Sequence, residues 1–329
     1  MDNKDTRKKQ MNNLARLWVI FILFAAIVGL SAWYFWRRDK RLGRGLPIYE
    51  SPFPVEITFI DGNPDIAVIS QDTYMAYLKK AYIMFGTYPD CEFYKISDKV
   101  ARNDYDWEND FYVPEGEAYY NYFKDGKRSG QIAIDVSEFN GDIDWKEVKK
   151  KGITLAIVRV GFRGYGSGTI VADECFEKNI KDAAAAGIKV GVYFYSQAIN
   201  RDEGIEEAKY VLEKIKSLPV KGPVVIDTEK VDDDEEARGN VISVEERTDA
   251  VVGFLETVKE AGYPPMVYAS TVWFVKYLDI ERIGDYPFWL ACYETPDFPY
   301  HTEAWQYMPS GWVPGIDHDT DLNVWMATY

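Results

Sequence analysis

From Gly130 to the end of the chain, short apolar segments alternate with helical patterns, and this repeat restricts the fold more than any other sequence feature. Strands that are apolar throughout and alternate with helices are typical of a parallel sheet covered on both sides. Eight such strands within about 200 residues favour a closed barrel over an open sheet. The predicted strands are 132–135, 155–160, 189–195, 223–226, 265–269, 287–291, 304–307 and 322–325.

Helical patterns separate most of the earlier strands. Ser243 and Glu246 have the spacing of a capping box at the start of one helix, and Gly262 follows its end. The last three strands lack clear helices between them. We therefore predict an α/β fold, an irregular TIM-like β/α barrel of about eight strands. The predicted helices are 145–151, 173–186, 201–217 and 243–261.

A run of 20 uncharged residues precedes the barrel, beginning at Leu17 and ending at Trp36. This length is enough for a helix to span the hydrocarbon core of a bilayer. A cleaved signal peptide should have a shorter apolar core and a small-residue cleavage site, whereas this run ends in bulky aromatics followed by Arg37 and Arg38. We therefore predict an uncleaved transmembrane helix. Equal numbers of basic residues flank its two ends, so charge does not decide the orientation.

The region between the anchor and the barrel has weaker patterns. Alternation at 55–60 and the turn signal that follows predict a strand, and the apolar spacing at 72–85 predicts a helix. We predict a small α+β accessory module. The expected domains are a cytoplasmic tail 1–16, a transmembrane helix 17–36, a linker with the accessory region 37–129, and a barrel 130–329.

Charge and residue counts exclude several classes of function. The formal net charge is −15, and many of the basic residues lie in the first 44 positions, so the rest of the chain is strongly acidic and unsuited to binding nucleic acid. The three cysteines are far apart and form no zinc motif. His318 among its neighbouring aspartates, and the acidic run 232–236, are interpreted as solvated loops rather than metal sites. We predict no metal and no cofactor.

Four acids lie at the ends of predicted strands: Asp135, Asp227, Glu229 and Asp321. Barrel enzymes carry their chemistry at one end of their strands. Residues two apart in an extended chain face the same side, so Asp227 and Glu229 should share a face, with Cα atoms roughly 6–7 Å apart. Two carboxylates are the minimum equipment for breaking a glycosidic bond. A single acid at such a position is often solvated or caps a helix, but four together indicate a catalytic site.

Several segments, in this order, resemble glycoside hydrolase family 25, the lysozymes that cleave peptidoglycan. They are 134–137 with 140–145, 158–164, 191–196, 227–229, and 304–307 with 313–316 and 321–323. The resemblance implies an irregular β/α barrel that hydrolyses the β-1,4 bond between N-acetylmuramic acid and N-acetylglucosamine. It implies that Glu229 is the general acid and that Asp227 is its partner, either as nucleophile or by orienting the substrate's N-acetyl group. Asp135 and Asp321 are implied to position substrate or water.

Other side chains near strand ends are candidates for contacting the sugar. Aromatic residues make up 16% of the chain, and their flat apolar faces suit sugar rings. The candidate substrate-binding residues are Tyr193, Tyr268, Trp289, Tyr293, Trp305 and Gln306. The chain departs from the family in its anchor, in residues 48–128, and in the acidic run after Glu229.

Three other functions remain open on the sequence. The barrel could bind glycan without cleaving it, although the intact acid set argues against this. It could be the scaffold of a membrane-tethered cell-wall assembly protein, which predicts normal partner binding after Glu229→Gln. It could also cleave another amino-sugar polymer such as chitin. For a peptidoglycan hydrolase we expect a single-pass protein of the cell membrane, with the catalytic domain outside the cytoplasm.

Overall fold

The computed structural model describes residues 58–59, 67–68, 78–86 and 91–327, and the chain divides into two compact units, Met1–Tyr74 and Met75–Tyr329. In the first unit, the described residues form the antiparallel pair β1 (Thr58–Phe59) and β2 (Ala67–Val68). The predicted membrane span 17–36 lies outside the described residues. Among the described residues, no helix has the length and apolar character needed to cross a membrane.

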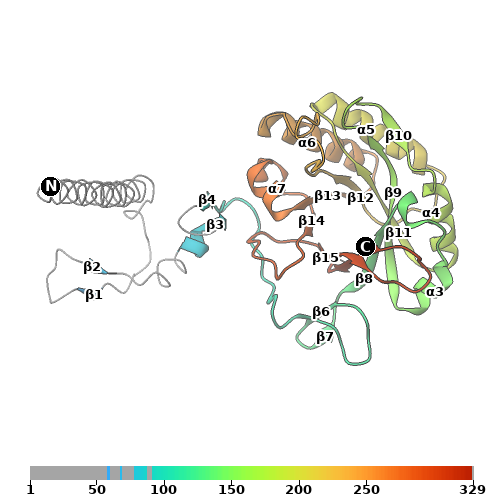
Figure 1. The fold of residues 1–329 in the computed structure, drawn as a ribbon, viewed down its shortest axis with the longest axis horizontal. Coiled ribbons are helices and arrows are strands. Elements are labelled where there is room, and N and C mark those ends of the chain that lie inside the picture. Colours follow the sequence, from blue (N-terminus) through green and yellow to red (C-terminus); the bar gives the residue numbers. More distant parts are fainter. Residues whose placement is uncertain (1–57, 60–66, 69–77, 87–90, 328–329) are drawn as a thin grey trace, which may run out of the picture. The chain divides into compact units, whose positions relative to one another are not determined.

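The second unit contains a closed barrel of eight strands, and all eight lie where the sequence predicts them (Figure 1). Around the ring, each strand pairing with the next, they are β9 (Ile153–Arg163), β11 (Lys189–Tyr195), β12 (Val224–Asp227), β13 (Pro265–Ser270), β14 (Phe288–Ala291), β15 (Ala304–Gly311), β16 (Thr320–Trp325) and β8 (Gln131–Val136). The ring closes where β8 pairs with β9. A further strand, β10 (Ile170–Ala172), pairs antiparallel with the end of β9.

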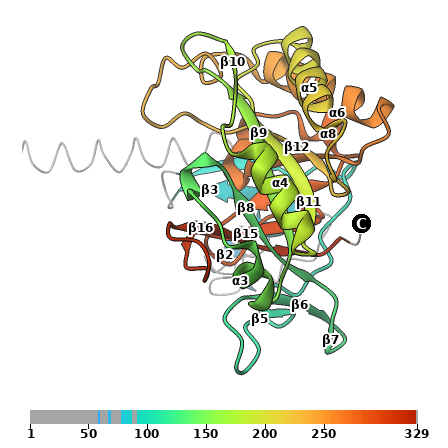
Figure 2. The same ribbon diagram turned by 90° about the vertical axis from the view of Figure 1, so that its right-hand side faces the viewer.

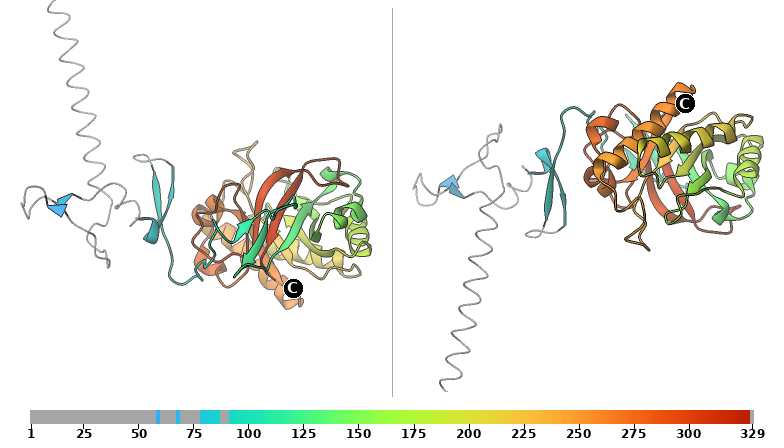
Figure 3. Two further views of the ribbon diagram at one scale, coloured as in Figure 1. Left: turned by 90° about the horizontal axis from the view of Figure 1, so that it is seen from below. Right: turned by 90° about the horizontal axis from the view of Figure 1, so that it is seen from above.

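The last strand departs from the predicted parallel sheet. Seven barrel strands run parallel, but β16 runs antiparallel to both β15 and β8 (Figure 3). The connection 312–319 contains no helix and is too short for a parallel crossover, which needs a dozen or more residues. The reversal places the beginning of β16 beside the carboxyl end of β8, with Asp321 opposite Asp135.

Helices cover the outer face of the barrel from β9 to β13 (Figures 1 and 2). The predicted capping box at Ser243 and Glu246 is confirmed. Helices α5 and α6 pack closely because Gly204 has no side chain; a Cβ there would lie 2.0 Å from the carbonyl oxygen of Ala250. The helices are α3 (Trp145–Lys150), α4 (Phe176–Ala185), α5 (Arg201–Ile215), α6 (Val244–Glu260), α7 (Thr271–Lys276) and α8 (Ile280–Ile283), with a 3-10 turn η2 (Glu138–Asn140) after β8.

Residues 92–100 contact helices α7 and α8 through Glu92 and Lys99. Residues 105–129 pack on the outside of the barrel where β15, β16 and β8 have no covering helix (Figure 2). They include the small sheet of β5 (Phe111–Tyr112), β6 (Asn121–Lys124) and β7 (Lys127–Arg128). Phe111 of this sheet and Trp107 just before it contact Trp305 of β15, whose ring centroid lies 5.6 Å from that of Phe111 and 5.4 Å from that of Trp107. An aromatic layer from outside the β/α repeat therefore takes the place of the missing helices.

The helix predicted for 72–85 is wrong at its end. Residues 78–81 are helical, but β3 (Tyr82–Phe85) is a strand that pairs antiparallel with β4 (Glu92–Lys95). Aromatic and β-branched residues fit a paired strand as well as an apolar helix face, and here the partner strand decides.

The interior of the barrel is filled below its mouth. One buried cluster lines the inside of the strands and includes Ala133, Val225 and Trp325, each with no exposed surface. Because side chains alternate along a strand, the residues two positions after Ala133 and Val225 also face inward. These residues are Asp135 and Asp227. The alternation of side chains along the strands therefore places both the core residues and these two acids inside the barrel.

Candidate active site

The barrel mouth contains a cavity of about 190 Å³. All four acids singled out from the sequence line it, together with five of the six predicted substrate-binding residues. The lining residues are Asp135, Tyr193, Asp227, Glu229, Tyr268, Trp289, Tyr293, Gln306 and Asp321. A group of acids distant in the chain therefore meets at one site.

Trp305 is the candidate that the structure places elsewhere. It lies on the opposite face of β15 from Gln306, packed against the aromatic layer of residues 105–129. Its indole Nε1 donates a hydrogen bond of 2.6 Å to the carbonyl oxygen of Cys292. Adjacent residues of a strand face opposite sides, which separates Trp305 from its neighbour in the cavity.

Asp135 is held by two side-chain amides. Gln306 Nε2 and Asn323 Nδ2 both donate to its Oδ2, at 3.1 Å and 2.8 Å. The amide of Gln306 is itself oriented, because its Oε1 accepts hydrogen bonds from the hydroxyls of Tyr268 (2.8 Å) and Tyr293 (3.0 Å). Burial raises the pKa of Asp135, and these two hydrogen bonds act against that rise because they favour the charged form of the carboxyl group.

Asn323 belongs to the site although it was not among the candidate residues. It is fully buried, and its Oδ1 accepts a 2.8 Å hydrogen bond from the indole Nε1 of Trp289. That bond leaves the Asn323 amide nitrogen to face Asp135. The sequence does carry a signal for it, because Asn323 lies two positions after Asp321 and so faces the same side of the strand.

Arg159 is a second site residue that was not among the candidates. It lies on the inner face of β9, two and four positions after the interior residues Ile157 and Leu155. Its Nε donates to Asp173 at 2.9 Å and its Nη2 to Glu138 at 3.0 Å. Arg159 is the cation that partly offsets the burial of Asp227, whose pKa burial raises.

The electrostatics of the mouth favour protonated acids. Burial, followed by the negative charges of Asp135 and Asp232, raises the pKa of Glu229 to about 7. Burial and the neighbouring Asp135 raise the pKa of Asp321 to about 9. Burial also raises the pKa of Asp227, and its Oδ1 has no hydrogen-bond partner within the described part of the chain. Glu229 can thus hold a proton near neutral pH, which is the requirement for a general acid.

The described residues contain no group of three or more His, Cys, Asp or Glu side chains arranged to hold a metal ion. The acidic run 232–236 lies in turns between β12 and α6. One of its acids, Glu235, pairs with Lys230 at 2.6 Å.

A β/α barrel whose mouth gathers four carboxylates, Asp135 and Asp227 buried and Glu229 with its pKa raised to about 7, has the construction of a glycoside hydrolase. Residues 134–316 match the model of the family described as Glycosyl hydrolases family 25. The match covers more than half of the 329 residues, and the chain belongs to this family.

Individual relatives agree with this assignment. The chain is 34% identical over 82 residues to Lysozyme M1 of Streptomyces globisporus, covering 25% of this chain and 26% of that protein. It is similar in structure to the modular autolysin LytC of Streptococcus pneumoniae, with a TM-score of 0.55, 28% identity, and coverage of 65% of this chain and 52% of that chain. A family 25 glycosyl hydrolase from Bacillus anthracis shares the fold, with a TM-score of 0.51 and 22% identity. The match covers 65% of this chain and 96% of that chain. The chain thus spans about half of LytC and about a quarter of Lysozyme M1.

Proposed function

We propose that this protein is a peptidoglycan hydrolase that cleaves the β-1,4 bond between N-acetylmuramic acid and N-acetylglucosamine. The observation that carries the proposal is that Glu229 shares a cavity with three other acids and has its pKa raised to about 7, so that it can hold a proton near neutral pH. The family supports the reaction class, and the structure of LytC has been determined in complex with a synthetic peptidoglycan ligand.

The proposed reaction starts with proton transfer. Glu229 donates its proton to the glycosidic oxygen as the bond to the anomeric carbon breaks. Positive charge then develops on that carbon, and Asp227 either attacks it or orients the substrate's own N-acetyl oxygen to do so. Glu229, now ionised, takes a proton from the water that completes hydrolysis, which restores the starting protonation. Asp135 and Asp321 position the substrate or this water.

The walls of the cavity are suited to a sugar. Tyr268 and Trp289 present aromatic rings whose centroids lie 4.6 Å apart, and Tyr293 has 54% of its surface exposed at the rim. Tyr268 and Trp289 are almost fully buried and form the base of the cavity, so the exposed ring of Tyr293 is the one on which the apolar face of a sugar can stack, while Gln306 offers a polar group inside.

We also propose that residues 17–36 anchor the protein in the cell membrane as a single transmembrane helix, with 1–16 in the cytoplasm. Residues 37–129 would be the linker and accessory region, and 130–329 the catalytic barrel. The length of the uncharged run supports this topology. Since peptidoglycan lies outside the membrane, the barrel would be extracytoplasmic.

The decisive experiment uses the full chain in detergent micelles with purified peptidoglycan, and measures reducing ends by mass analysis. Wild type should release muramic-acid reducing ends. Glu229→Gln, which keeps the shape but not the acid, should lower kcat by about 10²–10⁴-fold. Glu235→Gln in the neighbouring loop is the matched control and should stay close to wild type.

The same assay separates the alternatives. Glucosamine reducing ends, or equal rates for Glu229→Gln and wild type, would contradict the assignment. Binding of peptidoglycan without release of ends would indicate a glycan-binding module or an assembly protein. Faster release from chitin than from peptidoglycan would indicate another amino-sugar polymer as substrate.

A further inference from the structure

Glu229 lies just past the point where the barrel holds its strand. β12 ends at Asp227, and the backbone N–H of Thr228 still donates to the carbonyl oxygen of Tyr268 at 3.1 Å. Among the described residues, this is the last backbone hydrogen bond before the loop that follows. The orientation of Glu229 therefore depends on what fixes Thr228.

The side chain of Thr228 points away from the acids. Asp227 and Glu229 line the mouth cavity, whereas Thr228 is absent from it and lines a second, smaller cavity, which the other side of Glu229 also borders. Its Oγ1 accepts a hydrogen bond of 3.0 Å from the indole Nε1 of Trp273, the third residue of helix α7. Both side chains are buried, so the bond is shielded from competing water.

Trp273 is in turn fixed by Arg247 of α6. The guanidinium lies 4.7 Å from the centre of the indole ring. It is almost fully buried, yet it donates to the backbone carbonyls of Gly239, Ile242 and Tyr277 rather than to a carboxylate. A buried guanidinium without an acidic partner is costly. Here the guanidinium, which belongs to α6, joins the loop that contains Gly239 and Ile242 to the end of α7 at Tyr277.

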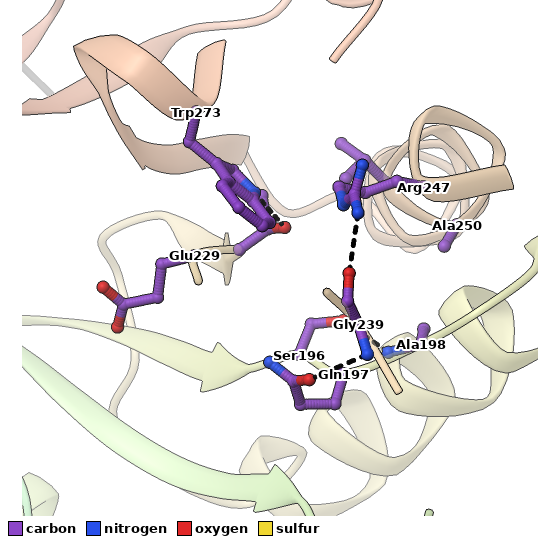
Figure 4. A pocket seen from close by; sticks show the side chains of 10 residues that line it. Ser196, Gln197, Ala198, Glu229, Gly239, Arg247, Ala250 and Trp273 are labelled. Atoms are coloured by element: carbon purple, nitrogen blue, oxygen red, sulfur yellow. Dashed lines mark hydrogen bonds between the residues drawn. The ribbon is translucent and has the colours of Figure 1, made fainter. Parts of the chain in front are cut away.

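The smaller cavity lies among these residues and has a volume of about 10 Å³, room for about one water molecule. Figure 4 shows the carboxylate of Glu229 directed away from Arg247, with Trp273 and Gly239 on the other sides of this space. The back of Glu229 is therefore closed by an ordered wall that admits little water.

We propose that Trp273 and Arg247 are positioning residues, which act through Thr228 to hold Glu229 facing the mouth cavity with its back shielded from solvent. The inference deepens the proposed function and rests on it for the role of Glu229. Neither residue touches the mouth cavity, so their effect on the reaction would pass through the indole–hydroxyl hydrogen bond.

The test compares four single variants of the full chain and the double variant Thr228→Val/Trp273→Phe. Thr228→Val removes the acceptor at nearly constant shape, Trp273→Phe removes the donor, and Thr228→Ser restores an acceptor. The matched control is Thr248→Val on α6, which loses buried hydrogen bonds to Val244 and from Asp279 but has no bond to the acids. Measurements are kcat, KM, the melting temperature, and the titration of Glu229 by NMR of carbon-13-labelled glutamate.

We expect Thr228→Val and Trp273→Phe each to lower kcat about tenfold with KM within about twofold, because misplacement of a reacting group is costly. The double variant should lose no more than either single variant. Thr228→Ser should recover most of kcat. The Glu229 titration should move to lower pH as water reaches its back, although the surrounding groups Asp135, Asp227, Asp232, Asp321, Tyr268 and Tyr293 are unchanged.

If Thr228→Val matches Thr248→Val, with a lower melting temperature but wild-type kcat and titration, the positioning role is overturned. Additive losses in the double variant would also overturn it. If wild type releases no reducing ends, the proposed function fails, and the NMR titration alone still decides whether Thr228 and Trp273 orient Glu229.

Discussion

The two halves of the barrel are built differently and supply different parts of the site. From β9 to β13 the strands alternate with helices, and this half supplies Asp227 and Glu229. From β15 through β16 to β8 the strands lie under an aromatic layer, and this half supplies the hydrogen-bonded set of Asp135, Gln306 and Asn323.

The two halves differ in the hydrogen bonds that they provide to a buried acid. Asp135, in the helix-free half, receives two amide hydrogen bonds. Asp227, in the helix-backed half, has a buried oxygen with no hydrogen-bond partner among the described residues. A buried polar atom without a partner costs stability, and such atoms are retained where function needs them. On the proposed mechanism, the reacting groups Asp227 and Glu229 therefore lie in one half and the hydrogen-bonded network around Asp135 in the other.

The largest expected effect is on the unpartnered acid. Asp227→Asn should lower kcat by about 10³-fold, since nucleophile and orienting roles both need the carboxylate. The same change should leave the melting temperature equal to or above that of wild type, because Asn has nearly the same shape and removes the cost of ionising a carboxyl group at this buried position. Reducing-end assays and thermal unfolding measure the two effects. A large loss of stability would show that Asp227 stabilises the fold, which would contradict the proposed difference between the two halves of the barrel.

The next largest effect tests the aromatic layer. Phe111 is buried against Trp305, with 4% of its surface exposed. Phe111→Ala should lower the free energy of unfolding by about 3–5 kcal/mol. Tyr112→Ala is the matched control, since Tyr112 is the next residue on the strand and is 41% exposed. Denaturant unfolding should show one transition for the whole of 75–329. A variant that unfolds in two steps would mean that the layer is separable from the barrel.

A third effect concerns pH. The pKa of Glu229 is raised to about 7, so in its proposed role as the acid kcat/KM should fall about tenfold per pH unit above that value. A raised pKa also means that the folded state binds the proton more tightly than the unfolded state. Its contribution to stability is therefore present below pH 4.5 and is lost as the pH rises to about 7. Measurements of kcat/KM and of the melting temperature from about pH 4 to about pH 9 test the direction of both predicted changes. A rate that rises above pH 7 would exclude Glu229 as the proton donor.

The smallest effect separates the two faces of the helix-free half. Trp289→Phe removes the hydrogen bond that orients Asn323, and should lower kcat about fivefold. Trp305→Phe removes a hydrogen bond of the same kind on the outer face, and should lower the melting temperature while kcat stays within about twofold. A loss of kcat greater than about twofold for Trp305→Phe would indicate that Trp305 contacts the sugar, as the sequence predicts.

The sequence by itself determined the eight barrel strands, the capping box of α6 and the four acids at the mouth. These follow from alternation, helical spacing and caps, which depend on residues close together in the chain. The same alternation also points to Asn323 and Arg159, once Asp321 and Leu155 are placed on inward faces.

Only the tertiary structure decided which segments meet. It set the reversed direction of β16, the strand at Tyr82–Phe85, the cover that residues 105–129 provide, and the outer position of Trp305. It also decided the bond from Trp273 to Thr228, which joins residues 45 positions apart. Such contacts depend on partners distant in the chain, and a local pattern records a residue's preference for burial or pairing without naming its partner.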